Sequence, residues 1–199
     1  MVLIAGVDEV GRGCLFGSVF AAVVVIAPGQ EQQLWDIGVK DSKKLSEKKR
    51  ELLFPQIKEI VTDWAIASAS VAEIDEINIL QSTFLAMRRA VEKLEIKPDH
   101  CLIDGNKLIP NFAYSQEALV KGDSKSAAIA AASILAKVAR DQEIVALAKT
   151  YPEYDLASNK GYGTKKHRQA ILQYGLTPEH RQSFKIKELK QLSLKLDTE

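Results

Sequence analysis

The chain has 199 residues, of which 46% are hydrophobic and 27% are charged, and its formal net charge is +1. This length fits one domain of ordinary size with a hydrophobic core of its own. The sequence has no run of about 18 uncharged apolar residues and no basic N-terminal segment before a long apolar stretch, so we expect neither a membrane span nor a secretory signal. The two cysteines, Cys14 and Cys101, lie far apart, which argues against a zinc site or a disulfide framework and fits a cytoplasmic protein.

The N-terminal half of the chain contains apolar runs and helical repeats separated by turn residues. In chain order they predict strands over residues 2–8 and 18–27, a loop over residues 28–45, a helix over residues 46–62, a strand over residues 63–71 and a helix over residues 73–94. The first two strands are expected to form an antiparallel pair joined by a glycine-rich turn. Ser46 is the expected cap of the first helix, which Pro55 must kink or split.

The C-terminal half continues with two short strands and then with helices. The pattern predicts strands over residues 100–105 and 113–121, helices over residues 123–149 and 164–174, and a further helix that starts at Thr177-Pro178. Thr164 is expected to cap the second of these helices, and Gly175 to end it. The alanine-rich start of the helix over residues 123–149 allows close approach to a neighbouring element. This succession of elements predicts a mixed α/β sheet.

Basic residues are concentrated in two segments. Residues 40–50 hold six Lys or Arg against two acids, and residues 159–190 hold eight against two. Basic segments that flank an acidic site suit a polyanionic substrate. The alternative is that both segments are the solvated faces of helices.

Carboxylates stand where three predicted elements begin or end: Asp8-Glu9, Asp104 and Asp123. If these ends converge, the four carboxylates provide the oxygen ligands of two divalent cations, which suits phosphodiester cleavage. Each also has a simpler interpretation, because Asp104 before Gly105 is a good turn residue and Asp123 is a good helix cap. Adjacent residues of a strand point to opposite faces, so we expect either that the strand ends at Asp8 or that one of the two carboxylates lies elsewhere.

The tract Gly11-Arg12-Gly13 follows the first two carboxylates directly. Glycines let a backbone approach a phosphate closely, and a guanidinium matches phosphate geometry. The tract therefore indicates metal-assisted chemistry on a phosphate.

Six motifs carry a resemblance to a known family. They are Gly6-Val7-Asp8-Glu9-Val10-Gly11-Arg12-Gly13, Asp41-Ser42-Lys43-Lys44-Leu45-Ser46, Ile103-Asp104-Gly105, Lys121-Gly122-Asp123-Ser124, Gly161-Tyr162-Gly163-Thr164-x-x-His167 and His180-Arg181-x-Ser183-Phe184. In this order and spacing, from about residue 4 to residue 185, the chain closely resembles bacterial ribonuclease HII. The related ribonuclease HIII has an extra N-terminal domain and usually a glutamate as its fourth acid, whereas Asp123 matches that position here.

The resemblance implies a ribonuclease H-like fold, in which a mixed five-stranded sheet is flanked by helices. Residues 1–150 would form the catalytic core, and residues 151–199 a C-terminal helical extension that packs on the core and contributes to substrate binding. The implied enzyme is a Mg²⁺- or Mn²⁺-dependent endonuclease that cuts the RNA strand of RNA–DNA hybrids. It also incises duplex DNA 5′ to a single embedded ribonucleotide, leaving a 3′-hydroxyl and a 5′-phosphate. The alternatives are another ribonuclease H-like nuclease, such as a junction resolvase, and a non-catalytic nucleic-acid-binding module.

The resemblance also implies roles for single residues. Asp8, Glu9, Asp104 and Asp123 match the catalytic acids that bind the metal. Gly11, Arg12 and Gly13 match the tract that contacts the 2′-hydroxyl and a neighbouring phosphate, and Tyr162 matches the tyrosine that stacks near the ribose–deoxyribose junction, although an aromatic in such a turn is equally common without a ligand. Further phosphate contacts are expected from basic side chains, namely Lys43, Lys44, Lys165, Lys166 and His167. His167 has an equally good interpretation as a structural hydrogen-bonding residue.

Two further segments are distinctive. After Gly13 many members of the family continue with proline and small residues, whereas this chain has Cys14-Leu15-Phe16-Gly17, so the shape of the pocket is open at this point. The tail Gln191-Leu192-Ser193-Leu194-Lys195-Leu196 resembles peptides that bind bacterial sliding clamps. The alternative is a continued amphipathic helix or a frayed terminus. No heptad repeat is present, so we expect a monomer.

Overall fold

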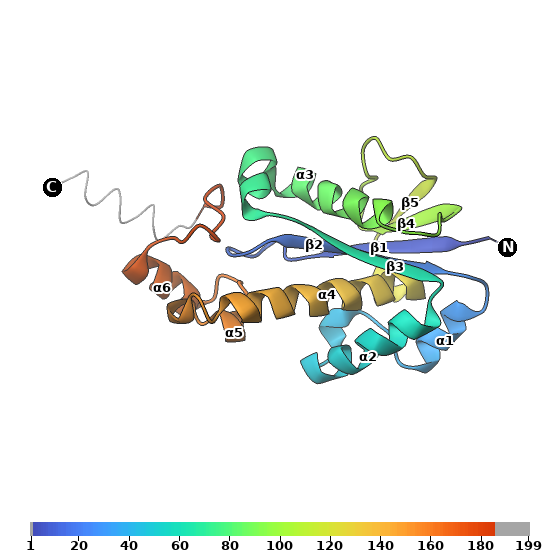
Figure 1. Ribbon diagram of the computed structural model, residues 1–199, viewed down its shortest axis with the longest axis horizontal. Coiled ribbons are helices and arrows are strands. Elements are labelled where there is room, and N and C mark those ends of the chain that lie inside the picture. The colour runs from blue at the N-terminus through green and yellow to red at the C-terminus, as the bar shows by residue number, and fades with distance from the viewer. Residues whose placement is uncertain (1, 186–199) are drawn as a thin grey trace.

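The centre of the molecule is one mixed five-stranded sheet (Figure 1). The computed structural model describes residues 2–185. The strand order is β3-β2-β1-β4-β5, with bounds β1 (Ile4–Val10), β2 (Val19–Ile26), β3 (Asp63–Ala69), β4 (His100–Asp104) and β5 (Gln116–Leu119). Strand β2 is antiparallel to both β1 and β3, whereas β4 is parallel to both β1 and β5. The predicted mixed sheet is therefore confirmed.

Helices cover both faces of this sheet (Figure 1). The longer helices are α3 (Val71–Glu92), which packs on β2 and β3, and α4 (Ala127–Leu147), which packs on β1 and β2 from the other side. The remaining helices are α1 (Gln30–Asp36) and α2 (Glu47–Ile60), which pack on α4, and α5 (Leu156–Asn159) and α6 (Lys165–Tyr174), which follow α4. Short 3-10 turns are η1 (Ser42–Lys44), η2 (Gly122–Ser124) and η3 (Pro152–Tyr154). None of the helices in residues 2–185 is long and apolar enough to cross a bilayer.

Small residues bring α4 directly onto β1. A Cβ atom placed on Gly6 of β1 would lie 2.2 Å from the backbone nitrogen of Ile129 in α4. The six residues from Ala127 to Ala132 are all completely buried. The close approach that the alanine-rich sequence predicted is confirmed, and any side chain at residue 6 would push the helix away from the strand.

Several elements differ from their prediction. Residues 28–45 were expected to be a loop, but they contain α1 and η1. Helix α2 contains Pro55 and is not split by it. Helix α3 is interrupted at Asn78, which has φ 69° and ψ 162° and whose side-chain oxygen accepts hydrogen bonds from the amides of Leu80 and Gln81. The side chain of Asn78 therefore acts as a second cap inside the helix.

The predicted helix at Thr177-Pro178 is wrong, because this segment forms a turn. The amide of His180 donates to the carbonyl of Thr177, and His180 forms a bridge with Phe16. The prediction that Thr164 caps a helix is confirmed. The side chain of Thr164 accepts a hydrogen bond from the amide of His167 at the start of α6. A separate apolar cluster joins α4 to the segments after it, with members Phe16, Ile144, Tyr154, Leu156, Ala170 and Ile171.

Candidate metal centre and the adjoining turns

Three carboxylates meet where β4 ends beside β1. Asp8, Glu9 and Asp104 each offer an oxygen atom, and these atoms lie within 4.8 Å of one another. The parallel pairing of β1 with β4 stops at Val7 and Ile103, whereas β1 continues to Val10. The edge of β1 is therefore open from Asp8 onward, and Asp104 stands at the corner of the opening.

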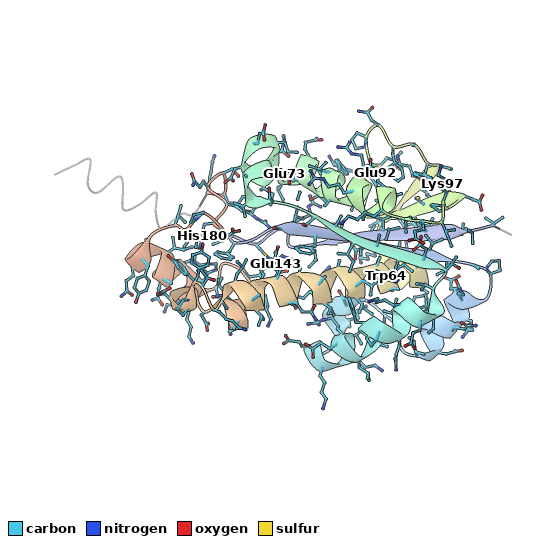
Figure 2. All side chains as sticks on the ribbon, in the orientation of Figure 1. Trp64, Glu73, Glu92, Lys97, Glu143 and His180 are labelled. Atoms are coloured by element: carbon cyan, nitrogen blue, oxygen red, sulfur yellow. The ribbon has the colours of Figure 1, made fainter. Side chains whose placement is uncertain are left out.

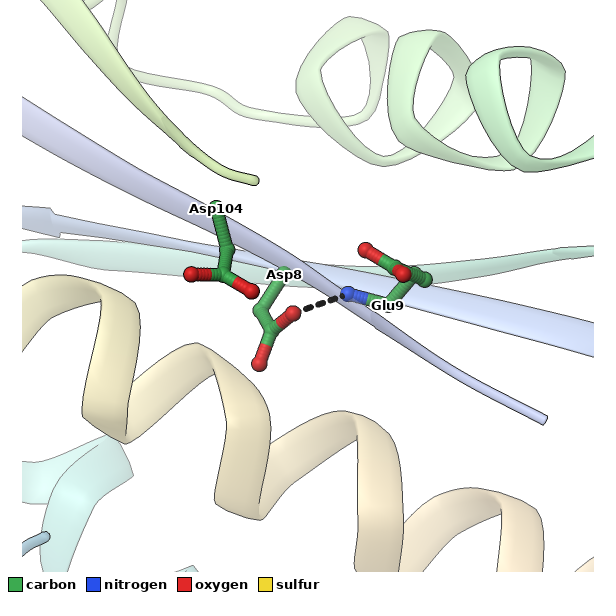
Figure 3. Close-up of side chains that lie close together, drawn as sticks. All are labelled: Asp8, Glu9 and Asp104. Atoms are coloured by element: carbon green, nitrogen blue, oxygen red, sulfur yellow. Dashed lines mark hydrogen bonds between the residues drawn. The ribbon is translucent and has the colours of Figure 1, made fainter. Parts of the chain in front are cut away.

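This open edge explains how two neighbouring residues of one strand reach the same place. Asp8 and Glu9 leave opposite faces of β1, as Figure 3 shows, with Asp8 directed toward α4. Both carboxylates lie at the part of the β1 edge that is not paired with β4. The expectation that the strand ends at Asp8, or that one carboxylate lies elsewhere, is wrong, because both residues lie within β1 and within the same acidic group.

Burial and mutual repulsion make this group unfavourable without a cation. Burial raises the pKa of Asp8 well above its usual value, and the charges of Glu9 and Asp104 raise it further. The amide of Glu9, which donates to Asp8 at 2.7 Å, and the charge of Lys43 oppose this shift. Burial also raises the pKa of Glu9, although the guanidinium of Arg12 at 3.4 Å lowers it in part. A bound cation would offset the remaining repulsion.

Asp123 lies beside this group across a pocket of about 340 Å³. Asp104 connects the acidic group with the segment that carries Asp123, since its Oδ1 atom accepts a hydrogen bond of 2.8 Å from the amide of Gly122. Burial raises the pKa of Asp123, and the charges of Asp41 and Asp104 contribute to this shift. Asp123 does not cap α4, because Ser126 occupies the N-cap position, so the helix-cap interpretation is wrong.

The pocket also contains an acid that the sequence reasoning missed. The carboxylate of Asp41 accepts a hydrogen bond from the amide of Lys43 and lies 3.7 Å from the ammonium group of Lys44. Both lysines line the pocket beside Asp104 and Asp123 and are exposed. The sequence signal for Asp41 was the motif that begins with this residue. From that motif, only Lys43 and Lys44 were predicted to contribute to the site. Carboxylates that surround one pocket and are held by backbone amides fit hard divalent cations such as Mg²⁺ and Mn²⁺.

The turn over residues 11–17 continues β1 away from the acidic edge. Gly11 has φ +94°, and a Cβ atom there would lie 2.2 Å from Nε of Arg140. Gly13, in contrast, faces open space. The side chain of Arg12 is 48% exposed and reaches back to Glu9. The turn is thus packed tightly on one side and accessible on the other.

Two buried arginines hold this turn, and the sequence reasoning gave neither of them a role. Arg140 donates to the carbonyl groups of Phe16, Ser18 and Lys160, and Arg181 donates to those of Arg12 and Gly17. Both side chains are almost completely buried.

The hydrogen bond to Arg12 sets the orientation of the next peptide. Arg181 holds the Arg12 carbonyl at 3.0 Å on the buried side. The C=O and N–H of a trans peptide point in opposite directions, so the N–H of Gly13 faces away from Arg181. Arg181 belongs to a motif noted in the sequence. Arg140 gave no signal beyond a charge within a largely apolar helix.

A second turn, over residues 160–163, lies against the first. The amide of Leu15 donates to the carbonyl of Gly161 at 2.9 Å, and a Cβ atom on Gly161 would lie 2.8 Å from the Phe16 carbonyl. The ring of Tyr162 is 42% exposed, with Lys137 5.7 Å and Arg140 6.0 Å from its centre. The buried side chains of Cys14 and Phe16 therefore lie at the junction of the two turns.

The basic residues around the start of α6 that were expected to contact phosphates differ in their exposure. Lys165 and Lys166 are exposed at the start of α6. His167 is completely buried, with Nδ1 2.9 Å from the carbonyl of Tyr162 and Nε2 3.1 Å from Nε2 of His180. A phosphate cannot reach it, so that interpretation is wrong and the structural one holds.

The fold and the acidic strand edge define the class as ribonuclease H-like α/β proteins. The structure is similar to ribonuclease H2 from Pyrococcus horikoshii OT3, with a TM-score of 0.81 and 30% identity over all of both chains. It is also similar to ribonuclease HII in a complex with PCNA from Archaeoglobus fulgidus, with a TM-score of 0.76 and 28% identity over 94% of this chain and 96% of that one. A ribonuclease HIII in complex with Mn²⁺, which is 20% identical, shares the fold with a TM-score of 0.73 over 97% of this chain and 70% of that one.

The sequence comparisons define the family. The family model for ribonuclease HII matches residues 5–187. The chain is 58% identical to ribonuclease HII of Acaryochloris marina (strain MBIC 11017) over 91% of each chain. It is 55% identical to that of Nostoc sp. (strain PCC 7120 / SAG 25.82 / UTEX 2576) over 92% of this chain and 81% of that one. The chain therefore belongs to the ribonuclease HII family, and it is a ribonuclease H-type endonuclease.

Proposed function

We propose that this enzyme incises duplex DNA 5′ to an embedded ribonucleotide and cleaves the RNA strand of RNA–DNA hybrids, leaving a 3′-hydroxyl and a 5′-phosphate. The observation that carries the proposal is the continuity of β1. The same strand presents Asp8 and Glu9 at its open edge and, directly afterwards, the accessible turn over residues 11–17. This arrangement supports chemistry on a phosphate beside a backbone that can contact a 2′-hydroxyl.

The acidic group would hold Mn²⁺ or Mg²⁺. Asp8, Glu9 and Asp104 provide the converging oxygen atoms, and Asp123 faces the same pocket as Asp104. When bound, divalent ions activate a water molecule and stabilise the leaving oxygen. Lys43 contributes positive charge close to Asp8 and Asp123, where the scissile phosphate would approach. This lysine favours a polyanion without reading its sequence.

The two turns would recognise the sugar. The outward N–H of Gly13 provides a donor at close range, and Arg12 provides a charge for a neighbouring phosphate. The exposed ring of Tyr162 lies beside Cys14, in the second turn, where it would pack against the following sugar. A flat ring in that place disfavours an additional hydroxyl group, which favours a ribonucleotide–deoxyribonucleotide junction. Lys165 and Lys166 would contact the backbone further along the duplex.

A substrate panel tests this function. Duplex DNA with one ribonucleotide, a matched all-DNA duplex and a four-way junction are each offered with Mg²⁺ or Mn²⁺. We expect incision of the first substrate only, on the 5′ side of the ribonucleotide, and a product end that a DNA polymerase extends. Asp104→Asn should abolish the cleavage, whereas Asp36→Asn, at an exposed carboxylate of α1, should not change it. Cleavage of the junction would favour a resolvase, and metal-independent binding without cleavage would favour a binding module.

We also propose that residues 191–196 bind a sliding clamp and that the enzyme is a monomer. These residues lie outside the part of the chain that the structure describes. The proposal is supported by the sequence Gln191-Leu192-Ser193-Leu194-Lys195-Leu196 and by the archaeal relative that was solved with PCNA. Purified bacterial clamp should co-elute with the wild-type chain and not with the double variant Gln191→Ala, Leu192→Ala. Equal co-elution of both, or of neither, would refute clamp binding through this segment.

A further inference from the structure

A buried chain of hydrogen bonds connects the residues after α6 to the backbone of Tyr162. It contains His167 in α6 and His180 in the following turn, with their Nε2 atoms 3.1 Å apart. Both imidazoles are buried, and His180 lies among the side chains at the end of the molecule that α6 occupies (Figure 2). Nδ1 of His180 is 3.0 Å from the amide of Thr177, and Nδ1 of His167 is 2.9 Å from the carbonyl of Tyr162.

The two ends of this chain determine where every proton lies. The amide of Thr177 is only a donor, and the Thr177 hydroxyl, 2.9 Å from the same nitrogen, can donate as well, so Nδ1 of His180 accepts. A neutral imidazole then carries its proton on Nε2, which donates to Nε2 of His167. The remaining proton of His167 is on Nδ1, where it donates to the carbonyl of Tyr162. Donors and acceptors match at each step, so the neutral pair has one order of protons.

The surroundings keep both imidazoles neutral. The rings of Phe16 and Tyr154 each lie 4.9 Å from the ring of His180. Burial lowers the pKa of His167, and burial together with His167 lowers that of His180 to about 4. The charged residues adjacent in sequence are Lys166 and Arg168 beside His167, and Glu179 and Arg181 beside His180. The guanidinium groups of Arg168 and Arg181 are bonded to carbonyl groups, and the charge of Asp155 acts on His167. An added proton would place two N–H groups face to face at 3.1 Å.

The acceptor at the end of the chain is the peptide that carries Tyr162. The amide of Tyr162 donates to the carbonyl of Asn159, and its carbonyl accepts from both Thr164 and His167. These bonds fix the backbone on both sides of the residue, while its ring remains partly exposed beside Cys14. The backbone of Tyr162 therefore sets the direction of its ring. A substitution of His167 that no longer donates to the Tyr162 carbonyl would allow the ring to move.

We propose that His167 and His180 are positioning residues, which hold Tyr162 through an ordered hydrogen-bond chain so that its ring distinguishes the sugar that follows the ribonucleotide. This inference rests on the proposed role of Tyr162 in substrate recognition. It assigns a task to the two histidines, neither of which touches the substrate. If the two histidines only stabilise the fold, variants of them should lose substrate selectivity only in proportion to their loss of folding stability.

Two variants of His167 separate these possibilities. In His167→Asn the side-chain amide occupies the place of Nδ1 and still donates to Tyr162. In His167→Gln it occupies the place of Nε2, so it faces His180 and leaves the Tyr162 carbonyl. Each variant removes the same ring and keeps one of its two bonds. Selectivity is the ratio of kcat/KM for a single embedded ribonucleotide to kcat/KM for an all-RNA strand in a hybrid, and Tyr162→Ala gives the value without the ring.

We expect His167→Asn to keep the wild-type ratio and His167→Gln to lower it on the order of tenfold, toward that of Tyr162→Ala. Thermal unfolding of both variants shows whether their stabilities match. Equal ratios in the two histidine variants, or a ratio that follows stability alone, would overturn the proposal. If Tyr162→Ala keeps the wild-type ratio while cutting normally, the recognition role of the ring fails but the proposed incision activity stands. If the wild-type chain does not cut, the proposed function itself fails.

The proton order has its own measurement. Nitrogen-15 spectra of the wild-type imidazoles at neutral pH should show His167 protonated on Nδ1 and His180 on Nε2. The opposite tautomers, or a charged ring at pH 7, would refute the chain regardless of activity. Selectivity should also remain constant down to about pH 5, since the pKa of His180 is held near 4.

Discussion

Replacing Asp8 by Asn should stabilise the metal-free protein while it removes the activity. The carboxylate is buried, and its neighbours Glu9 and Asp104 offer oxygen atoms within 4.8 Å. At that separation each pair of charges repels by about 3.5 kcal/mol for an effective dielectric constant near 20. Lys43 and the amide of Glu9 offset part of this cost. Asn keeps the acceptor for that amide and has no charge, so we expect a gain of about 2 kcal/mol, or about 4–8 °C in Tm.

The pH dependence of this gain follows from the direction of the pKa shifts. Folding raises the pKa of Asp8, so the folded protein holds that proton more tightly than the unfolded chain does. The penalty is absent below the unfolded pKa of about 4 and increases as the pH rises through the folded pKa. The difference in Tm between Asp8→Asn and wild type should therefore be largest near pH 8 and shrink toward pH 4.

Thermal unfolding with EDTA and with excess Mn²⁺ checks both parts of the argument. Mn²⁺ should raise the Tm of the wild-type chain by linkage and have a much smaller effect on Asp8→Asn. Asp36→Asn changes an exposed carboxylate and should leave Tm unchanged under both conditions. An Asp8→Asn protein that is no more stable than wild type in EDTA would refute the repulsion argument. Equal stabilisation of both proteins by Mn²⁺ would refute the assignment of Asp8 as a ligand.

Three further variants probe other parts of the site. Gly11→Ala places a Cβ atom 2.2 Å from Arg140 at φ +94°, so urea unfolding should show a loss of about 2–4 kcal/mol. Asp123→Asn should lower kcat on the order of a hundredfold while the circular dichroism spectrum is unchanged, and near-normal kcat would remove it from the metal site. Lys43→Ala should weaken binding of all duplexes alike and reduce the salt slope of log Kd by about 1, which a filter-binding series measures.

The elements that the sequence predicted well are those with a long and regular pattern. The apolar run of β2 and the apolar repeat of α3 each extend over several turns or pleats, so packing and local preference agree. Helix α1 was missed because only Leu34 of its seven residues is buried, which is too short a pattern to recognise. The start signal at Thr177-Pro178 was misleading for another reason. The amides that would continue a helix, from Arg181 to Ser183, donate instead to Leu15 and Asp75.

In the candidate site, too, some features could be predicted from the sequence and others could not. The carboxylates at the ends of strands were visible in the sequence, but their convergence depends on where β4 stops relative to β1. That is a matter of register between segments more than 90 residues apart. The burial of Arg140 and Arg181 was not visible either, since their acceptors are carbonyl groups of turns and not acidic side chains. The sequence left His167 open between a phosphate contact and a structural hydrogen bond, because its partner is a second histidine, outside any metal-ligand spacing.

Helix α4 and strand β1 together set the distance between the acidic edge and the turn over residues 11–17. Gly6 packs against Ile129, and Gly11, five residues further along the chain and directly after β1, packs against Arg140, eleven residues further along α4. A strand advances about 3.3 Å per residue and a helix about 1.5 Å, so both paths cover about 16.5 Å. The spacing of the two contacts along the strand therefore matches their spacing along the helix. Because Asp8 and Glu9 lie between them, inserting or deleting one residue in this part of the chain would release the turn or displace the carboxylates. Either change would separate the acidic group from the turn that we propose to recognise the 2′-hydroxyl.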